Sequence, residues 1–128
     1  MVAELQRHRE KSPEELRADR TALLAVEHAL QRAIQNVLDI GTHILVSAGV
    51  NDWDDYQGVI QKLGEKGLIP LEFARRIGDM AGMRNILVHA YTDVDVEKIR
   101  DVLRDELDDF NVFAGYIVDY LEEQEGDR

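Results

Sequence analysis

Apolar residues recur every three to four positions along most of this chain, which is the spacing of one face of an α-helix. The pattern is clearest in two long segments, 19–47 and 96–122. In the first, the apolar positions are Leu23, Val26, Leu30, Ile34, Val37, Ile44 and Leu45. In the second, they are Val96, Ile99, Leu103, Leu107, Phe110, Phe113, Ile117 and Leu121. Strand-like alternation with β-branched residues is scarce, so the pattern predicts an all-α protein.

Helix start signals divide the first half of the chain. Ser12-Pro13-Glu14-Glu15 has the form of a capping box with proline at the first helical position. It predicts a short helical turn after an N-terminal helix at about 2–10. Asp19 is placed to cap a long helix that runs to about Ser47, where a Gly-Val-Asn-Asp segment breaks it.

The second half is divided in the same way. A helix at about 54–66 should end at Gly67, and Pro70 should open another that runs to about His89. Asp93 or Asp95 would cap the last helix, which runs to about 122. Because the connections are short, we expect an up-and-down bundle of about five helices forming one domain over residues 1–128.

The helix at 70–89 carries a positive charge within its apolar face. Arg84 lies near the centre of an arc formed by Phe73, Ile77, Met80, Ala81, Leu87 and Val88. Burying a cation without a partner is costly, so an anion is expected there. It would be either a carboxylate such as Asp39 or Asp79, in a structural ion pair, or a bound phosphate. His89 and Tyr91 in the next turn and a half favour the phosphate.

A second stripe on this helix contains two glycines. Gly78, Gly82, Asn85 and His89 lie on one side of the helix. A glycine inside a helix costs about 1 kcal/mol relative to alanine, which is understandable if another backbone approaches closely. The approaching helix is either its own copy in a second protomer or the long helix at 19–47. We expect a homodimer with Gly78 and Gly82 in its seam, which would place both copies of Arg84 and His89 around one cleft.

Composition narrows the classes of function. The chain has 128 residues, no cysteine and a net charge of −11, which argues against a broad nucleic-acid-binding face. Residues 93–128 hold 13 acidic and 4 basic residues, whereas residues 1–92 hold 13 and 11. A local cationic pocket at Arg84 is therefore permitted, with Arg75 and Arg76 on the polar arc of the same helix. The charged start and the lack of roughly 20 consecutive apolar residues predict a soluble cytoplasmic protein that does not enter a membrane.

Several other residues are weaker candidates. Asp39 and His43 have the spacing of two metal ligands, but two ligands do not make a site, and a hydrogen-bonded pair is favoured. Trp53 and Tyr56 in the middle connection would either stack on a base or, more commonly, anchor that loop. No phosphate-binding glycine loop, nucleophile elbow or zinc motif is present, so we expect neither a metal nor a cofactor.

The segment from Arg84 to Tyr91 resembles the Arg-x4-His-x-Tyr motif of the HepT-like branch of the HEPN superfamily. These proteins are the toxin halves of HEPN/minimal nucleotidyltransferase toxin–antitoxin pairs. Residues 33–44, 63–70 and 106–110 are similar to the second helix, the mid-chain connection and the last helix of that family. The resemblance covers nearly the whole chain in order.

The resemblance implies a metal-independent endoribonuclease with a composite active site in a homodimer. Arg84 would hold the RNA phosphate, and His89 would serve as acid or base, which suits the chemistry of both side chains. Asn85 would orient His89, bind a phosphate oxygen or merely line the interface. Tyr91 would be the residue to which a nucleotidyltransferase antitoxin adds AMP.

Two alternatives stay open from these residues alone. One is a non-catalytic module that binds nucleotide or substrate for a minimal nucleotidyltransferase. The other is a structural dimer in which Arg84 is an internal ion pair.

Overall fold

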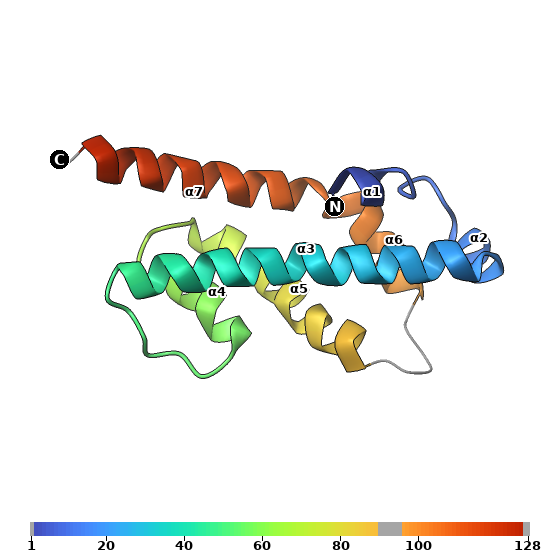
Figure 1. The fold of residues 1–128 in the computed structure, drawn as a ribbon, viewed down its shortest axis with the longest axis horizontal. Helices are drawn as coiled ribbons and strands as arrows, with labels where there is room; N and C mark the ends of the chain where they lie inside the picture. Colours follow the sequence, from blue (N-terminus) through green and yellow to red (C-terminus); the bar gives the residue numbers. More distant parts are fainter. Residues whose placement is uncertain (1, 90–95, 127–128) are drawn as a thin grey trace.

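The computed structural model describes residues 2–89 and 96–126, and these form helices joined by turns and loops (Figure 1). The helices are α1 (Val2–Gln6), α2 (Pro13–Ala18), α3 (Arg20–Ser47), α4 (Tyr56–Glu65), α5 (Leu71–His89), α6 (Val96–Asp105) and α7 (Asp108–Gly126). No strand occurs among the described residues. The predicted all-α helical bundle is confirmed.

The helix caps form where the local sequence predicts them. The Ser12 hydroxyl accepts a hydrogen bond from the Glu15 amide, and the Glu15 carboxylate accepts one from the Ser12 amide, which completes the capping box at α2. The Asp19 carboxylate accepts from the Ala22 amide at 3.0 Å and begins α3. Asp55 caps α4 by accepting from the Gly58 amide at 2.8 Å, so this helix begins at Tyr56 rather than at 54.

The first helix is shorter than predicted. It ends at Gln6 rather than near residue 10. The amides of His8 and Arg9 bond to the carbonyl groups of Leu5 and Gln6, three residues back, so the chain tightens into turns.

The prediction of one continuous helix at 96–122 is wrong, because this segment forms two helices, α6 and α7. The break lies at Glu106 and Leu107, where the amides of Asp109 and Phe110 bond to carbonyl groups only three residues back. Leu107 in the break and Phe110 in the first turn of α7 are both buried. A tight turn preserves the three-residue spacing of buried positions, so the apolar pattern gives no sign of it. The predicted caps Asp93 and Asp95 lie outside the described residues.

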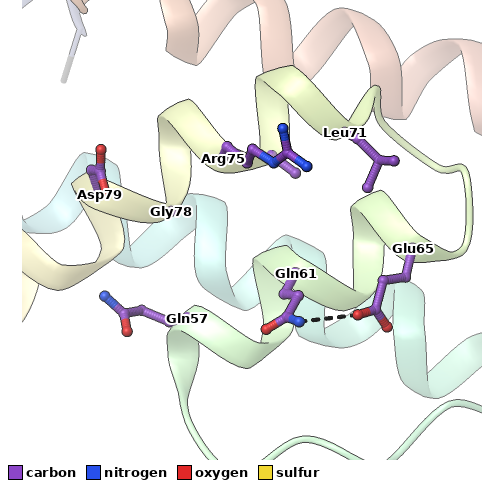
Figure 2. A pocket seen from close by; sticks show the side chains of 8 residues that line it. Gln57, Gln61, Glu65, Leu71, Arg75, Gly78 and Asp79 are labelled. Carbon is purple, nitrogen blue, oxygen red and sulfur yellow. Dashed lines mark hydrogen bonds between the residues drawn. The ribbon is translucent and has the colours of Figure 1, made fainter.

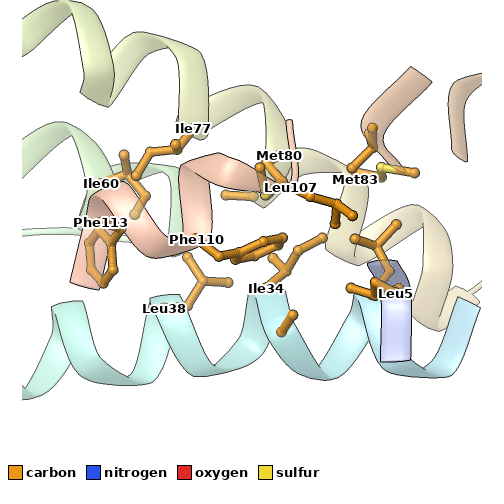
Figure 3. Close-up of a cluster of buried hydrophobic side chains, with 14 of the residues drawn as sticks. Leu5, Ile34, Leu38, Ile60, Ile77, Met80, Met83, Leu107, Phe110 and Phe113 are labelled. Atoms are coloured by element: carbon orange, nitrogen blue, oxygen red, sulfur yellow. The ribbon is translucent and has the colours of Figure 1, made fainter. Parts of the chain in front are cut away.

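The core fixes the position of α5 within the bundle. Helix α3 runs the length of the molecule, and α4, α5 and α7 pack around it (Figure 1). Figure 3 shows side chains of α3, α5 and α7 converging, among them Leu38, Ile77, Met80, Phe110 and Phe113.

No helix in the described part of the chain is long and apolar enough to cross a membrane.

Candidate active site

The apolar arc of α5 is buried as predicted. Phe73, Ile77, Met80, Ala81 and Leu87 all lie in the core. Arg84 is half-buried, so this residue lies at the boundary between the core and the solvent. The side chain of Val88 lies outside the described residues.

Arg84 is held by an amide from the middle of α3. Its Nε donates a hydrogen bond to Gln35 Oε1 at 2.8 Å, and Gln35 Nε2 donates to Asp39 Oδ1, also at 2.8 Å. Arginine only donates and an ionised carboxylate only accepts, so the two partners fix which way the amide points. Asp39, one of the two carboxylates expected near Arg84, is thus linked to it through a neutral amide. The other, Asp79, lines a groove on α5.

Gln35 was not singled out from the sequence. The sequence indicates only its contact with Asp39, because Gln35 lies four residues earlier and the two are on neighbouring turns of one helix face. Nothing in that spacing points to Arg84, which is 49 positions away along the chain.

The favoured hydrogen-bonded pair of Asp39 and His43 is wrong. Asp39 accepts from Gln35 instead, one turn earlier, and both Asp39 and His43 are exposed. Within residues 2–89 and 96–126, no group of three or more His, Cys, Asp or Glu side chains lies close enough together to hold a metal ion.

The remaining motif residues lie on or just after the end of α5. Asn85 is helical, and His89 is the last residue of the helix. At a rise of about 1.5 Å per residue, His89 follows Arg84 by about 7.5 Å along the axis. The side chains of Asn85 and His89, and the whole of Tyr91, lie outside what the structure describes.

A groove of about 420 Å³ runs between α4 and α5 (Figure 2). It is lined by Gln57, Gln61, Glu65, Leu71, Ala74, Arg75, Gly78 and Asp79. Figure 2 shows the three α4 side chains on one wall and Arg75 and Asp79 on the other. Both signs of charge are therefore present on its α5 wall.

The two glycines of the predicted seam differ in their surroundings. A Cβ added at Gly78 would meet no atom within 4 Å, so this position faces open space. A Cβ at Gly82 would lie 3.0 Å from Gln57 Nε2, the far end of a side chain on α4. Neither position packs against α3, which was the intramolecular explanation for the stripe.

The other arginines of α5 have different roles. Arg75 is exposed on the groove. Arg76 forms a two-point ion pair with Asp109 on α7, with Nε to Oδ2 at 3.1 Å and Nη2 to Oδ1 at 2.9 Å. Its guanidinium also lies 5.3 Å from the ring centroid of Phe73. The sequence placed Arg76 on the polar arc and gave no sign that Asp109 is buried.

Trp53 anchors the connection between α3 and α4. Trp53 is half-buried and packs against the core, which agrees with the anchoring interpretation. The side chain of Tyr56, its predicted companion, lies outside the described residues.

The described residues thus form a helical bundle in which Arg84 is held at the edge of the core, five residues before His89 on the same helix. The chain matches the model of the family described as Ribonuclease HepT-like over residues 1–117, and it belongs to that family.

Curated relatives carry nuclease names. The chain is 31% identical over 100 residues to the "tRNA nuclease HepT" of Aphanizomenon flos-aquae, covering 77% of this chain and 67% of that protein. It is 27% identical over 88 residues to the "mRNA nuclease HepT" of Shewanella oneidensis, covering 69% of this chain and 66% of that protein. The chain therefore spans about two thirds of the length of these relatives.

Solved structures share the fold. A toxin–antitoxin complex crystallised with AMP-PNP superposes with a TM-score of 0.82 at 23% identity, covering 91% of this chain and 87% of that one. A tri-AMPylated HEPN toxin of Shewanella oneidensis in complex with its MNT antitoxin gives a TM-score of 0.76 at 24% identity, covering 91% and 92%.

Proposed function

We propose that this protein is the toxin of a toxin–antitoxin pair and a metal-independent endoribonuclease, with Arg84 and His89 at the reacting phosphate. The observation that carries the proposal is the position of Arg84. A half-buried guanidinium on α5 is held by Gln35, and the motif histidine follows it by five residues on the same helix. The nuclease names of the curated relatives support RNA cleavage as the activity.

The reaction is an internal transesterification of RNA. A base removes the proton from a 2′-hydroxyl, the resulting oxygen bonds to the adjacent phosphorus, and the bond from phosphorus to the 5′-oxygen breaks. An acid protonates the departing oxygen, which leaves a 2′,3′-cyclic phosphate and a 5′-hydroxyl. His89 serves as base or acid, and Arg84 stabilises the charge that develops on the phosphate oxygens.

The proposed active unit is a homodimer whose seam includes Gly78 and Gly82. Gly78 faces open space on a groove that has both signs of charge on one wall. A two-fold axis near this groove would bring the second copy of α5 alongside the first, so that two His89 residues share the roles of acid and base.

Partner control would act through Tyr91. Addition of AMP to this residue by a minimal nucleotidyltransferase would bring phosphate charge close to Arg84 and block the approach of RNA. The AMPylated neighbour of the same fold supports this proposal.

The nuclease proposal is tested by incubating the pure protein with total RNA, with and without EDTA. We expect cleavage in both samples and cyclic phosphate ends. Arg84→Ala and His89→Ala should abolish cleavage, while Arg104→Ala, which removes an exposed charge on α6, should not. Activity that disappears with EDTA and returns with Mg²⁺ would rule out the mechanism. A protein that binds the antitoxin but cleaves no RNA would instead support the non-catalytic partner subunit.

The modification proposal is tested by treating the protein with its cognate nucleotidyltransferase and ATP. Intact-mass spectrometry should detect AMP-sized increases on the wild type and none on Tyr91→Phe, which should keep ribonuclease activity after treatment. Equal mass increases on the two proteins would place the modification elsewhere.

A further inference from the structure

A second groove, of about 500 Å³, lies at the other end of α5 from His89, between α7 and the turn that joins α4 to α5 (Figure 1). We call it the distal groove. One wall is formed by residues 64 and 67–71, among which Leu71 is 54% exposed. The other wall is one face of α7, with Tyr116, Asp119, Tyr120 and Glu123 at spacings of three and four residues.

The charged side chains described on the distal groove are all acidic. Asp119 and Glu123 are exposed, and neither forms an ion pair with another described residue. No Lys, Arg or His is among the described residues that line the groove. Helix α7 as a whole holds six acidic residues and no basic one. This surface repels the phosphates of RNA and of anionic lipids, and it attracts a cation.

Two tyrosines alternate with these carboxylates. The ring of Tyr116 packs edge-on against Phe73 of α5, with the ring centroids 5.2 Å apart. Tyr120, one turn further on, is half-buried and packs against the core. Aromatic rings beside carboxylates suit an arginine or lysine side chain. The ring attracts the cation, the aliphatic stem packs on apolar surface, and the carboxylate pairs with the charged end.

We infer that the distal groove is a docking site for a basic segment of the antitoxin. Arginine or lysine side chains of that segment pack along Tyr116 and Tyr120 and pair with Asp119 and Glu123. The inference rests on the proposed function, which supplies the antitoxin as a protein partner, and it deepens that function by giving the partner a place to bind.

The position of the groove separates docking from modification. Leu71 and His89 are the first and last residues of α5, so they lie about 27 Å apart at a rise of about 1.5 Å per residue. A small domain is about this wide, so one partner can hold the groove and still reach the catalytic end of α5. Docking there raises the effective concentration of the antitoxin at that end.

Charge reversals on α7 test the docking site. Glu123→Lys and Asp119→Lys each place a cation in the groove, where it repels a basic segment. Glu122→Lys makes the same change at an exposed position of α7 that does not line the groove, so it is the matched control. Tyr120→Leu keeps an apolar side chain and removes the aromatic ring.

Affinity for the purified antitoxin is measured by isothermal titration calorimetry at low and high salt. Glu123→Lys and Asp119→Lys should each weaken binding about tenfold at low salt, because attraction becomes repulsion. Salt screens both, so their difference from the wild type should shrink at high salt. Tyr120→Leu should weaken binding about threefold through the lost cation–ring contact. The control Glu122→Lys should bind within about twofold of the wild type.

Transfer of AMP from ATP to the toxin, which releases pyrophosphate, gives a second readout. At low toxin concentration, Glu123→Lys and Asp119→Lys should accept AMP more slowly than the wild type. At saturating toxin concentration the rates should converge, because the groove contributes binding and no chemistry. Without antitoxin, both variants should cleave RNA as the wild type does, and circular dichroism melting should show them folded.

Two results would overturn the inference alone. One is antitoxin binding that Glu123→Lys and Asp119→Lys weaken no more than Glu122→Lys does. The other is a changed oligomeric state of Glu123→Lys without antitoxin, by light scattering, which would assign the groove to a second copy of this chain.

Two further results separate the inference from the proposed function. A wild-type protein that binds the antitoxin but cleaves no RNA would refute the proposed nuclease, while the affinities would still decide the role of the distal groove. A wild-type protein that does not bind the antitoxin would refute both the proposed partner and the docking site.

Discussion

Arg76 and Arg84 lie eight residues apart on α5, and groups of different chemistry on different helices hold them. Arg76, on the polar arc, is the member of an ion pair with the buried carboxylate of Asp109. Arg84, within the apolar arc, is held by the amide of Gln35.

The difference teaches how one helix can carry both a structural and a functional arginine. Asp109 is buried and ionisable, so Arg76 satisfies it and joins α5 to α7. Arg84 donates from Nε to the Gln35 amide at the edge of the core, and the proposed function gives it the RNA phosphate as a ligand. We therefore expect substitutions at Arg76 to change mainly the stability of the protein and substitutions at Arg84 to change mainly its activity.

The largest expected effect is a crossover between two alanine substitutions. Arg84→Ala should lower ribonuclease activity by about 1,000-fold or more, in the range of a lost transition-state contact, with a small change in stability. Arg76→Ala should keep most of the activity and lower the free energy of unfolding by about 1–3 kcal/mol, because it leaves Asp109 buried without its partner. RNA cleavage assays and urea unfolding measure the two effects.

Asp109→Asn is the control for Arg76→Ala. It removes the buried charge together with the ion pair, so it should destabilise the protein less. If Arg76→Ala abolished cleavage in a fully folded protein, the assignment of separate roles would be wrong.

A second expected effect concerns two glycines, one on α4 and one on α5. A Cβ at Gly64 would lie 2.8 Å from Ala74 Cβ at the contact between α4 and α5, whereas one at Gly78 would meet nothing. Gly64→Ala should therefore lower stability by about 1–3 kcal/mol and preserve the dimer. Gly78→Leu should leave the chain folded but yield a monomer without activity, and light scattering with thermal melting distinguishes the two.

Gly82→Leu tests the same seam, but its side chain must also displace Gln57, so a loss of the dimer could come from a change within the protomer. A wild-type protein that is monomeric at micromolar concentration, or a Gly78→Leu protein that remains dimeric and active, would contradict the proposed seam.

The smallest expected effect is on pH dependence beside the Arg76 ion pair. Burial, and then the nearby carboxylate of Asp109, raises the pKa of Glu106 above its ordinary value of 4.5. The folded state then holds this proton more tightly than the unfolded state, so the contribution of Glu106 to stability falls as pH rises above about 4.5. Glu106→Gln should be slightly more stable than the wild type at pH 7 and equal to it below pH 4, by urea unfolding. A larger advantage at low pH would reverse this account.

The sequence by itself determined the features that depend on neighbours within about one helical turn. The capping box at Ser12 and the cap at Asp19 bond to amides three residues ahead, so their partners are in the local sequence. The buried arc of α5 follows from helical periodicity, which also put Arg84 near the centre of that arc, where the structure leaves it half-buried. The Arg-x4-His-x-Tyr motif gave the family for the same reason, since its residues are consecutive.

Only the tertiary structure decided which distant groups meet. Gln35 lies 49 positions from Arg84, and Asp109 lies 33 positions from Arg76. No periodicity encodes these pairings, because they depend on how α3 and α7 are rotated and shifted against α5. The open space at Gly78 has the same origin, since a glycine in a helix leaves room for a neighbour without specifying whether one is there. Local hydrogen bonds are fixed by spacing along the chain, and the environment of a charge is fixed by helix packing.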